Sequence, residues 1–153
     1  MRSLMGLLLV PAFLTFSLGV AAGEKHGITE ITLRRCGGSD GKRPVDELTF
    51  RSDGTARYVG KSNVQKIGEF TGRIPDLYFG STFDNLAEAY IAASVAGLNS
   101  KPTMNTTIVC LVVIRDGKKL ETTDNCPGSD SKLFTIEMAI LGIALDIEWK
   151  KRG

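Results

Sequence analysis

Apolar and polar residues alternate along residues 48–60, and the pair Asp53-Gly54 divides the alternation in two. A pair of this kind between alternating runs is the strongest short-range signal of a β-hairpin. A two-residue loop would mix the two faces of the ribbon. A three-residue loop sets Phe50 opposite Ala56, keeps one face apolar, and places Gly54 in the left-handed conformation that glycine adopts readily. We therefore predict a hairpin with the three-residue loop.

Three other stretches predict further strands. Residues 28–35 alternate, with an uncertain parity near their start, and residues 64–71 form a second candidate. Residues 106–114 are rich in β-branched residues and are apolar on both faces from Ile108 to Ile114, which is typical of a central strand that is covered on both sides. After the turn at Asp116-Gly117, residues 118–123 return as its hairpin partner. Both registers of this hairpin pair apolar residues equally well, so its loop length stays open.

Two stretches have helical spacing. Residues 82–96 follow Ser81, which suits an N-cap, and repeat apolar positions every three to four residues. Residues 131–150 carry two apolar stripes, which predict two buried faces, one on the sheet and one on the first helix. The first stripe is Leu133, Ile136, Ile140, Ile143 and Ile147, and the second is Phe134, Met138, Leu141, Leu145 and Trp149.

The order of elements is therefore strand, hairpin, strand, helix, hairpin, helix. Strands that are grouped in hairpins, with helices between the groups, favour an α+β fold. We predict a single domain over residues 23–153, with an antiparallel sheet of about five to six strands and two helices packed on one face.

The first 22 residues resemble a cleavable secretory signal. Arg2 supplies the positive start, residues 4–18 are apolar, and Val20-Ala21-Ala22 provides small residues for cleavage after Ala22. A membrane anchor is the alternative, but the apolar run is short and Pro11 interrupts it. No later segment is long and apolar enough to span a bilayer. We therefore expect a secreted or periplasmic protein.

Charge and cysteine content bear on the class of partner and on the number of disulfides. The formal net charge of +2 gives no reason to expect nucleic acid or an acidic polymer as a partner. Export implies an oxidising compartment, so one disulfide among Cys36, Cys110 and Cys126 is expected, with one thiol left over. Three single bridges are possible, and we favour Cys110–Cys126 because it closes the shortest loop.

Residues 37–43 form a glycine-rich, basic loop that invites comparison with a phosphate-binding loop. Gly41-Lys42 match that pattern, but Cys36 replaces its first glycine and Arg43 replaces its hydroxyl residue. We therefore interpret the loop as flexible and solvated. Weak anion contact by Lys42 and Arg43 remains as a minor hypothesis.

Catalytic chemistry has little support in the sequence. Arg34, Arg35 and Lys42 lie near Cys36 and would lower its pKa, but a nucleophile usually needs an adjacent base. The only histidine, His26, lies ten residues away. A disulfide or an inert thiol is therefore the preferred interpretation of Cys36.

The acidic residues have no spacing that is diagnostic of paired catalytic acids or of a metal site. The sequence accordingly predicts no catalytic residue, no metal and no cofactor. Asn105 begins an N-glycosylation sequon, which has meaning only in a source that glycosylates such sites.

Several short motifs in order suggest a relationship. They are Leu33-Arg34-Arg35-Cys36, Pro44-Val45, Leu48, Asp53-Gly54, Tyr58-Val59-Gly60, Phe70-Thr71-Gly72, Phe83 with Leu86-Ala87, Thr106-Thr107, residues 115–118, and a closing helix through Trp149. Together, over residues 31–151, they resemble a family of exported bacterial proteins whose shared domain has no assigned function.

Two positions depart from that family. Arg43 stands where members have a second cysteine before the proline, and Cys126 stands where members often have an aromatic residue. If members join their two loop cysteines, the resemblance implies that Cys36 has lost its partner and is free or paired with Cys126 or Cys110. The family supplies no activity and no catalytic residues to carry over.

These observations favour a non-enzymatic binding or interaction module of the periplasm or cell exterior. Its partner would be a protein, a cell-wall component or a small molecule. One alternative is a thiol-based redox enzyme that uses Cys36. A second alternative is a secreted inhibitor of a hydrolase, since small stapled domains serve that role.

Overall fold

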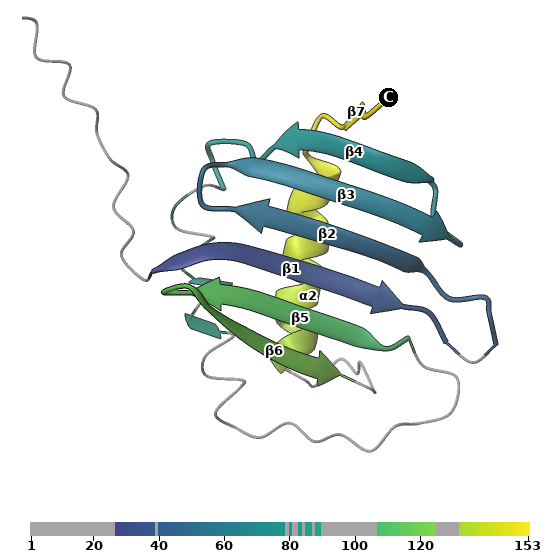
Figure 1. Cartoon of the computed structure of the whole chain (residues 1–153), viewed down its shortest axis with the longest axis horizontal. Helices are drawn as coiled ribbons and strands as arrows, with labels where there is room; N and C mark the ends of the chain where they lie inside the picture. Colours follow the sequence, from purple (N-terminus) through teal and green to yellow (C-terminus); the bar gives the residue numbers. More distant parts are fainter. Residues whose placement is uncertain are drawn as a thin grey trace, which may run out of the picture.

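The computed structural model describes residues 27–38, 40–78, 80, 83, 85, 86, 88, 89, 107–124 and 132–153. Within these residues the chain forms one seven-stranded antiparallel sheet, and helix α2 (Lys132–Leu145) crosses one of its faces (Figure 1). The strands are β1 (Ile28–Cys36), β2 (Val45–Arg51), β3 (Thr55–Ser62), β4 (Gly68–Arg73), β5 (Val109–Arg115), β6 (Lys118–Asp124) and β7 (Lys150–Lys151). Their order in the sheet is β6-β5-β1-β2-β3-β4-β7.

The predicted fold of five to six strands under two helices is wrong. The sheet has seven strands, and α2 is the one continuous helix in the described part of the chain. The predicted helix at residues 82–96 lies mostly outside the described residues, although Phe83 and Leu86 belong to the core. No helix among the described residues combines the length and apolarity that a bilayer span requires.

The C-terminal helix is shorter than predicted. It ends at Leu145 and not at Lys150, and the chain then pairs with β4 as strand β7, so that Thr71 lies opposite Lys150. The indole Nε1 of Trp149 donates a hydrogen bond of 3.0 Å to the carbonyl oxygen of Ala144, one of the last carbonyls of α2. Helix-end carbonyls lack partners within the helix, so this bond helps to terminate it.

The first hairpin is confirmed in its register. Phe50 lies opposite Ala56, and Leu48 lies opposite Tyr58. Gly54 has a φ of 80°, and its amide donates to the carbonyl oxygen of Arg51. The left-handed residue at the end of the loop therefore provides the geometry that the apolar pattern requires.

The second hairpin has the two-residue loop. Arg115 pairs with Lys118, and both Asp116 and Gly117 have positive φ. For the predicted coverage of β5 on both faces, the described residues show α2 over one face only. Val112 on the other face is nevertheless 5% exposed, since it lies in register between neighbouring strands.

Two of the predicted strands also differ in detail from the strands in the structure. The register of β1 against β5 shifts between Ile28 and Glu30, so Ile28 and Ile31 are both buried despite their odd spacing. The strand predicted at residues 64–71 begins only at Gly68, because β3 continues to Ser62 and the turn follows it.

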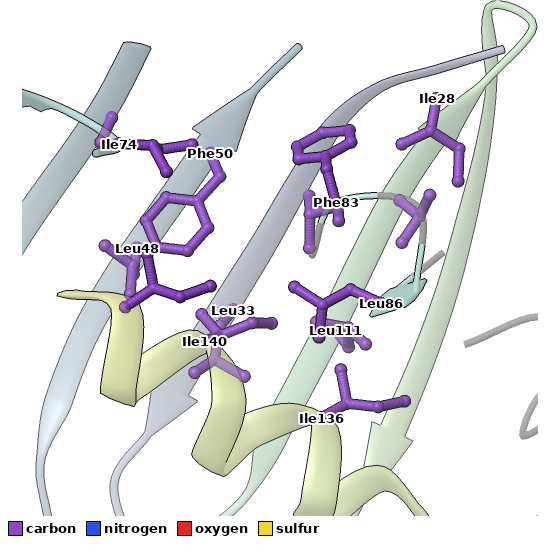
Figure 2. Packing of buried hydrophobic residues seen from close by; sticks show 14 of the residues in the cluster. Ile28, Leu33, Leu48, Phe50, Ile74, Phe83, Leu86, Leu111, Ile136 and Ile140 are labelled. Carbon is purple, nitrogen blue, oxygen red and sulfur yellow. The ribbon is translucent and has the colours of Figure 1, made fainter. Parts of the chain in front are cut away.

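The core lies between α2 and the sheet. Ile136 and Ile140 point from the helix toward Leu33, Leu48 and Leu111 of the strands (Figure 2). All five residues of the first stripe are buried, as predicted. The second stripe is not a buried face, because Met138 is 51% exposed and Leu145 is 86% exposed.

The sheet face opposite α2 is polar. Ion pairs connect Arg34 to Glu47, Glu47 to Arg57, Arg57 to Glu69 and Glu69 to Arg152 at distances of 2.9 to 3.3 Å. Because these side chains bridge neighbouring strands and keep contact with water, this face needs no covering layer.

A candidate binding groove between helix and sheet

The uncovered stripe of α2 forms one wall of a groove with a volume of about 490 Å³. Leu33, Leu48 and Tyr58 of the sheet form its floor, and the turn at residues 63–66 forms the opposite wall. The helix wall is Met138, Leu141, Gly142, Ala144 and Leu145, and Trp149 also lines the groove. The volume lies in the range of small-molecule sites.

Two glycines shape this groove. A Cβ atom at Gly60 would lie 1.8 Å from the carbonyl oxygen of Lys66, so the missing side chain allows the turn to approach β3. A Cβ atom at Gly142 would meet nothing within 4 Å. Tight packing therefore does not require Gly142, and the absence of a side chain there widens the groove.

The aromatic residues of the groove form a connected group. The ring centroids of Tyr58 and Trp149 are 5.8 Å apart with an interplanar angle of 51°, and Tyr58 also contacts Phe70. Trp149 is the only tryptophan of the chain. Tryptophan fluorescence of the chain therefore comes from one residue in the lining of the groove.

A polar group lies at the floor of the groove. Arg35 Nε donates a hydrogen bond of 2.7 Å to Asp46 Oδ1, and a second guanidinium nitrogen bonds Asp46 Oδ2. The hydroxyl of Tyr58 donates to the same Oδ2 atom at 3.1 Å. Asp46 is 6% exposed, so its charge depends on these donors for stabilisation.

The pKa values of this polar group follow from burial and from Asp46. Burial, followed by the charge and hydrogen bond of Asp46, raises the pKa of Tyr58 to about 12. The hydrogen bond to Asp46 raises the pKa of Arg35, and the charge of Glu137 contributes in the same direction. Glu137 is itself buried on α2. At neutral pH the floor therefore keeps a guanidinium and a neutral phenol.

The groove therefore has the chemistry of a binding site. Aliphatic and aromatic walls favour an apolar ligand surface, and a few fixed polar groups at one place favour a defined orientation. Both oxygens of Asp46 already accept hydrogen bonds from protein groups, so the protein itself fixes the position of this carboxylate. Among the described residues no group of three His, Cys, Asp or Glu side chains could hold a metal ion.

A second hollow of about 920 Å³ lies near strands β3, β4 and β7 and is rich in arginine. Arg51 pairs with Glu30, while Arg57 and Arg152 both pair with Glu69. These cations already have carboxylate partners. The smaller groove, with its exposed apolar wall, is therefore the stronger candidate.

The predicted anion contacts do not belong to the groove. Lys42 and Arg43 are exposed on their loop, and Arg43 lies 3.7 Å from Asp40. Asn63 Nδ2 donates to the carbonyl oxygens of Gly41 and Arg43, which connects this loop to the turn after β3. The loop is therefore anchored to the turn that forms one wall of the groove.

Cys36 and Cys110 lie on the other face of the sheet. Cys36 is exposed and Cys110 is partly exposed, and both are free thiols, while Cys126 lies outside the described residues. Burial and the neighbouring Cys110 raise the pKa of Cys36 and outweigh the lowering effect of Arg34 and Lys61. A raised pKa works against the reactive thiolate of the redox-enzyme hypothesis.

Sequence reasoning missed the groove because it assigned the second stripe of α2 to core packing. The available signal was Gly142, which interrupts an otherwise large and apolar helix surface. Arg35 and Asp46 also belonged to alternating strands whose other inward residues are apolar. Polar residues at inward positions of such strands are the second signal that sequence reasoning could have used.

Comparison with known proteins does not assign this chain to a family. No model of a protein family matches the sequence, and no curated protein matches it. What characterises the described part of the chain is its fold, a seven-stranded antiparallel sheet crossed by helix α2, and the groove between the two.

Proposed function

We propose that this protein is an exported, non-enzymatic binding module whose ligand occupies the groove between α2 and the sheet. The observation that carries the proposal is the exposed apolar wall of α2, where Leu145 is 86% exposed, in the same groove as the partly buried Arg35 and its buried partner Asp46. The signal-like pattern of residues 1–22 supports export.

The ligand class follows from the lining. An apolar body would cover Met138, Leu141 and Leu145 and remove their surface from water, which stabilises the complex by about 25 cal/mol per Å² of apolar area. A polar group on the same molecule would lie against the floor at Arg35 and Tyr58. We therefore propose a small amphipathic molecule.

Trp149 provides the test. We would titrate the purified full chain with 1-anilinonaphthalene-8-sulfonate and measure energy transfer from Trp149 to the bound dye. Straight-chain fatty acids and alkylamines would then compete for the site. We expect saturable binding of one dye molecule, with displacement by the longer chains.

A pair of variants locates the binding. Gly142→Phe fills the groove, because nothing lies within 4 Å of the added Cβ atom. Thr135→Phe adds the same ring to an exposed position of α2 outside the groove lining. We expect Gly142→Phe to weaken dye binding at least about tenfold, equivalent to 1.4 kcal/mol, and Thr135→Phe to leave it unchanged.

A cooperative thermal unfolding transition would confirm that both variants are folded. Equal dye affinity for the two variants, or no saturable binding to the unmodified chain, would refute the proposal.

A further inference from the structure

Cys36 and Cys110 lie on adjacent strands and on the same face of the sheet. Cys110 pairs with Arg34 in the register of β1 against β5, and the amide of Cys36 donates to the carbonyl oxygen of Ile108 at 2.9 Å. Cys36 is therefore displaced by two residues from the partner of Cys110. Two-residue steps keep side chains on one face, so the thiols are diagonal neighbours.

The surroundings of the two thiols permit approach and reaction. Cys36 is exposed and Cys110 is partly exposed, so small molecules reach both. The thiols also interact, because Cys110 contributes a hydrogen bond to the groups that raise the pKa of Cys36. Cys110 Sγ lies 3.6 Å from Thr123 Oγ1, a weak contact that a rotating side chain can leave.

The position within the sheet allows the movement that a bond needs. β1 ends at Cys36 and β5 begins at Val109, so the pair lies where both strands end. Gly37 follows with a φ of 76°. Its carbonyl oxygen accepts a backbone hydrogen bond from the amide of Ile108. A disulfide requires Cα atoms within about 7 Å and a rotation of both side chains. Strand ends accommodate such a shift more easily than the middle of a sheet.

We propose that Cys36 and Cys110 form a cross-strand disulfide when the protein meets a low-molecular-weight disulfide such as oxidised glutathione. The structure then represents the reduced form. The bond would tie β1 to β5 on the face opposite the groove, and it makes no use of the proposed ligand.

The reaction consists of two thiol–disulfide exchanges. The Cys36 thiolate attacks one sulfur of glutathione disulfide, forms a mixed disulfide and releases one glutathione thiolate. The Cys110 thiolate then attacks the sulfur of Cys36, forms the protein disulfide and releases the second glutathione thiolate. The protein loses two electrons and two protons, and glutathione disulfide becomes two glutathione thiols.

The bond would close a loop that contains β2, β3 and β4. Closing a long loop restricts the unfolded chain, so the oxidised protein should be more stable than the reduced one. We expect the melting temperature to rise by about 5–10 °C on oxidation.

Peptide mapping tests the pairing directly. The full chain would be incubated with oxidised glutathione, alkylated with iodoacetamide, digested with trypsin without reduction, and analysed by mass spectrometry. Cleavage after Lys42 and after Arg115 places the three cysteines in separate peptides. We expect Cys36 linked to Cys110, and Cys126 alkylated.

Two variants distinguish the Cys36–Cys110 disulfide from the Cys110–Cys126 disulfide, which closes the shortest loop. The Cys126→Ser variant should keep the rise in melting temperature, and the Cys36→Ser variant should lose it. A Cys110–Cys126 linkage, a stable mixed disulfide with glutathione at Cys36, or three alkylated cysteines would each overturn the proposal.

Discussion

Arg35 and Asp46 lie opposite each other on β1 and β2 beneath α2, and the guanidinium donates two hydrogen bonds to the carboxylate. The next pair along the same strands, Arg34 with Glu47, lies on the open face of the sheet. The chemistry of the two pairs is nearly the same, but their exposure differs. Asp46 is 5% exposed at its side chain and Glu47 is 24% exposed.

This contrast predicts different costs for two similar substitutions. Asp46→Asn would leave a partly buried guanidinium without its counter-charge and should lower the free energy of unfolding by about 3 kcal/mol. Glu47→Gln should lower it by less than about 1 kcal/mol, because solvent screens the exposed pairs. Urea unfolding curves would measure both values. Equal losses for the two variants would contradict the difference in burial.

The two stripes of α2 also predict unequal effects. Ile140 is 1% exposed, so Ile140→Ala should lower the free energy of unfolding by about 2–5 kcal/mol. Leu141 lines the groove and is only partly buried, so Leu141→Ala should cost less than half of that. Denaturant unfolding of the two variants would measure both losses in the free energy of unfolding. A larger loss for Leu141→Ala would mean that the second stripe is covered.

Two glycines should respond in opposite directions to the same substitution. A Cβ atom at Gly72 would lie 2.4 Å from Ile147 Cγ2, so Gly72→Ala must displace the segment between α2 and β7 and should destabilise the protein by about 1–3 kcal/mol. Gly142 lies in a helix with free space around it, so Gly142→Ala should stabilise by about 0.5–1 kcal/mol. Thermal unfolding would show the two shifts, and a shift in the same direction for both would contradict the packing described here.

Tyr58 should make stability fall at alkaline pH. Its pKa in the folded protein is about 12, against 10.0 for an ordinary phenol, because it is partly buried beside Asp46. Between these values the unfolded chain loses the phenolic proton while the folded protein keeps it, so the free energy of unfolding decreases as pH rises.

The measurement is a series of urea unfolding curves from pH 9 to about pH 12, for the unmodified chain and for Tyr58→Phe. We expect a shallower decrease in the variant, since Phe has no proton to lose. Identical pH profiles would show that Tyr58 ionises equally in both states. An ultraviolet titration of the folded protein would give the same answer independently.

Local interactions determined what the sequence alone predicted correctly. The register of Phe50 opposite Ala56 follows from the alternation of side chains and from the loop that ends at Gly54. The buried stripe from Leu133 to Ile147 follows from helical periodicity. Both depend on residues that are near each other in the chain, and their physical causes act over one turn or one hairpin.

Tertiary structure decided the rest. Whether Met138 and Leu145 are buried depends on what lies over α2, which the periodicity of the helix does not contain. The end of α2 at Leu145 depends on the pairing of β7 with β4, a contact between distant segments. The groove arises from both effects, because an apolar stripe remains open above inward-facing polar residues, and only the arrangement of the whole chain brings those features together.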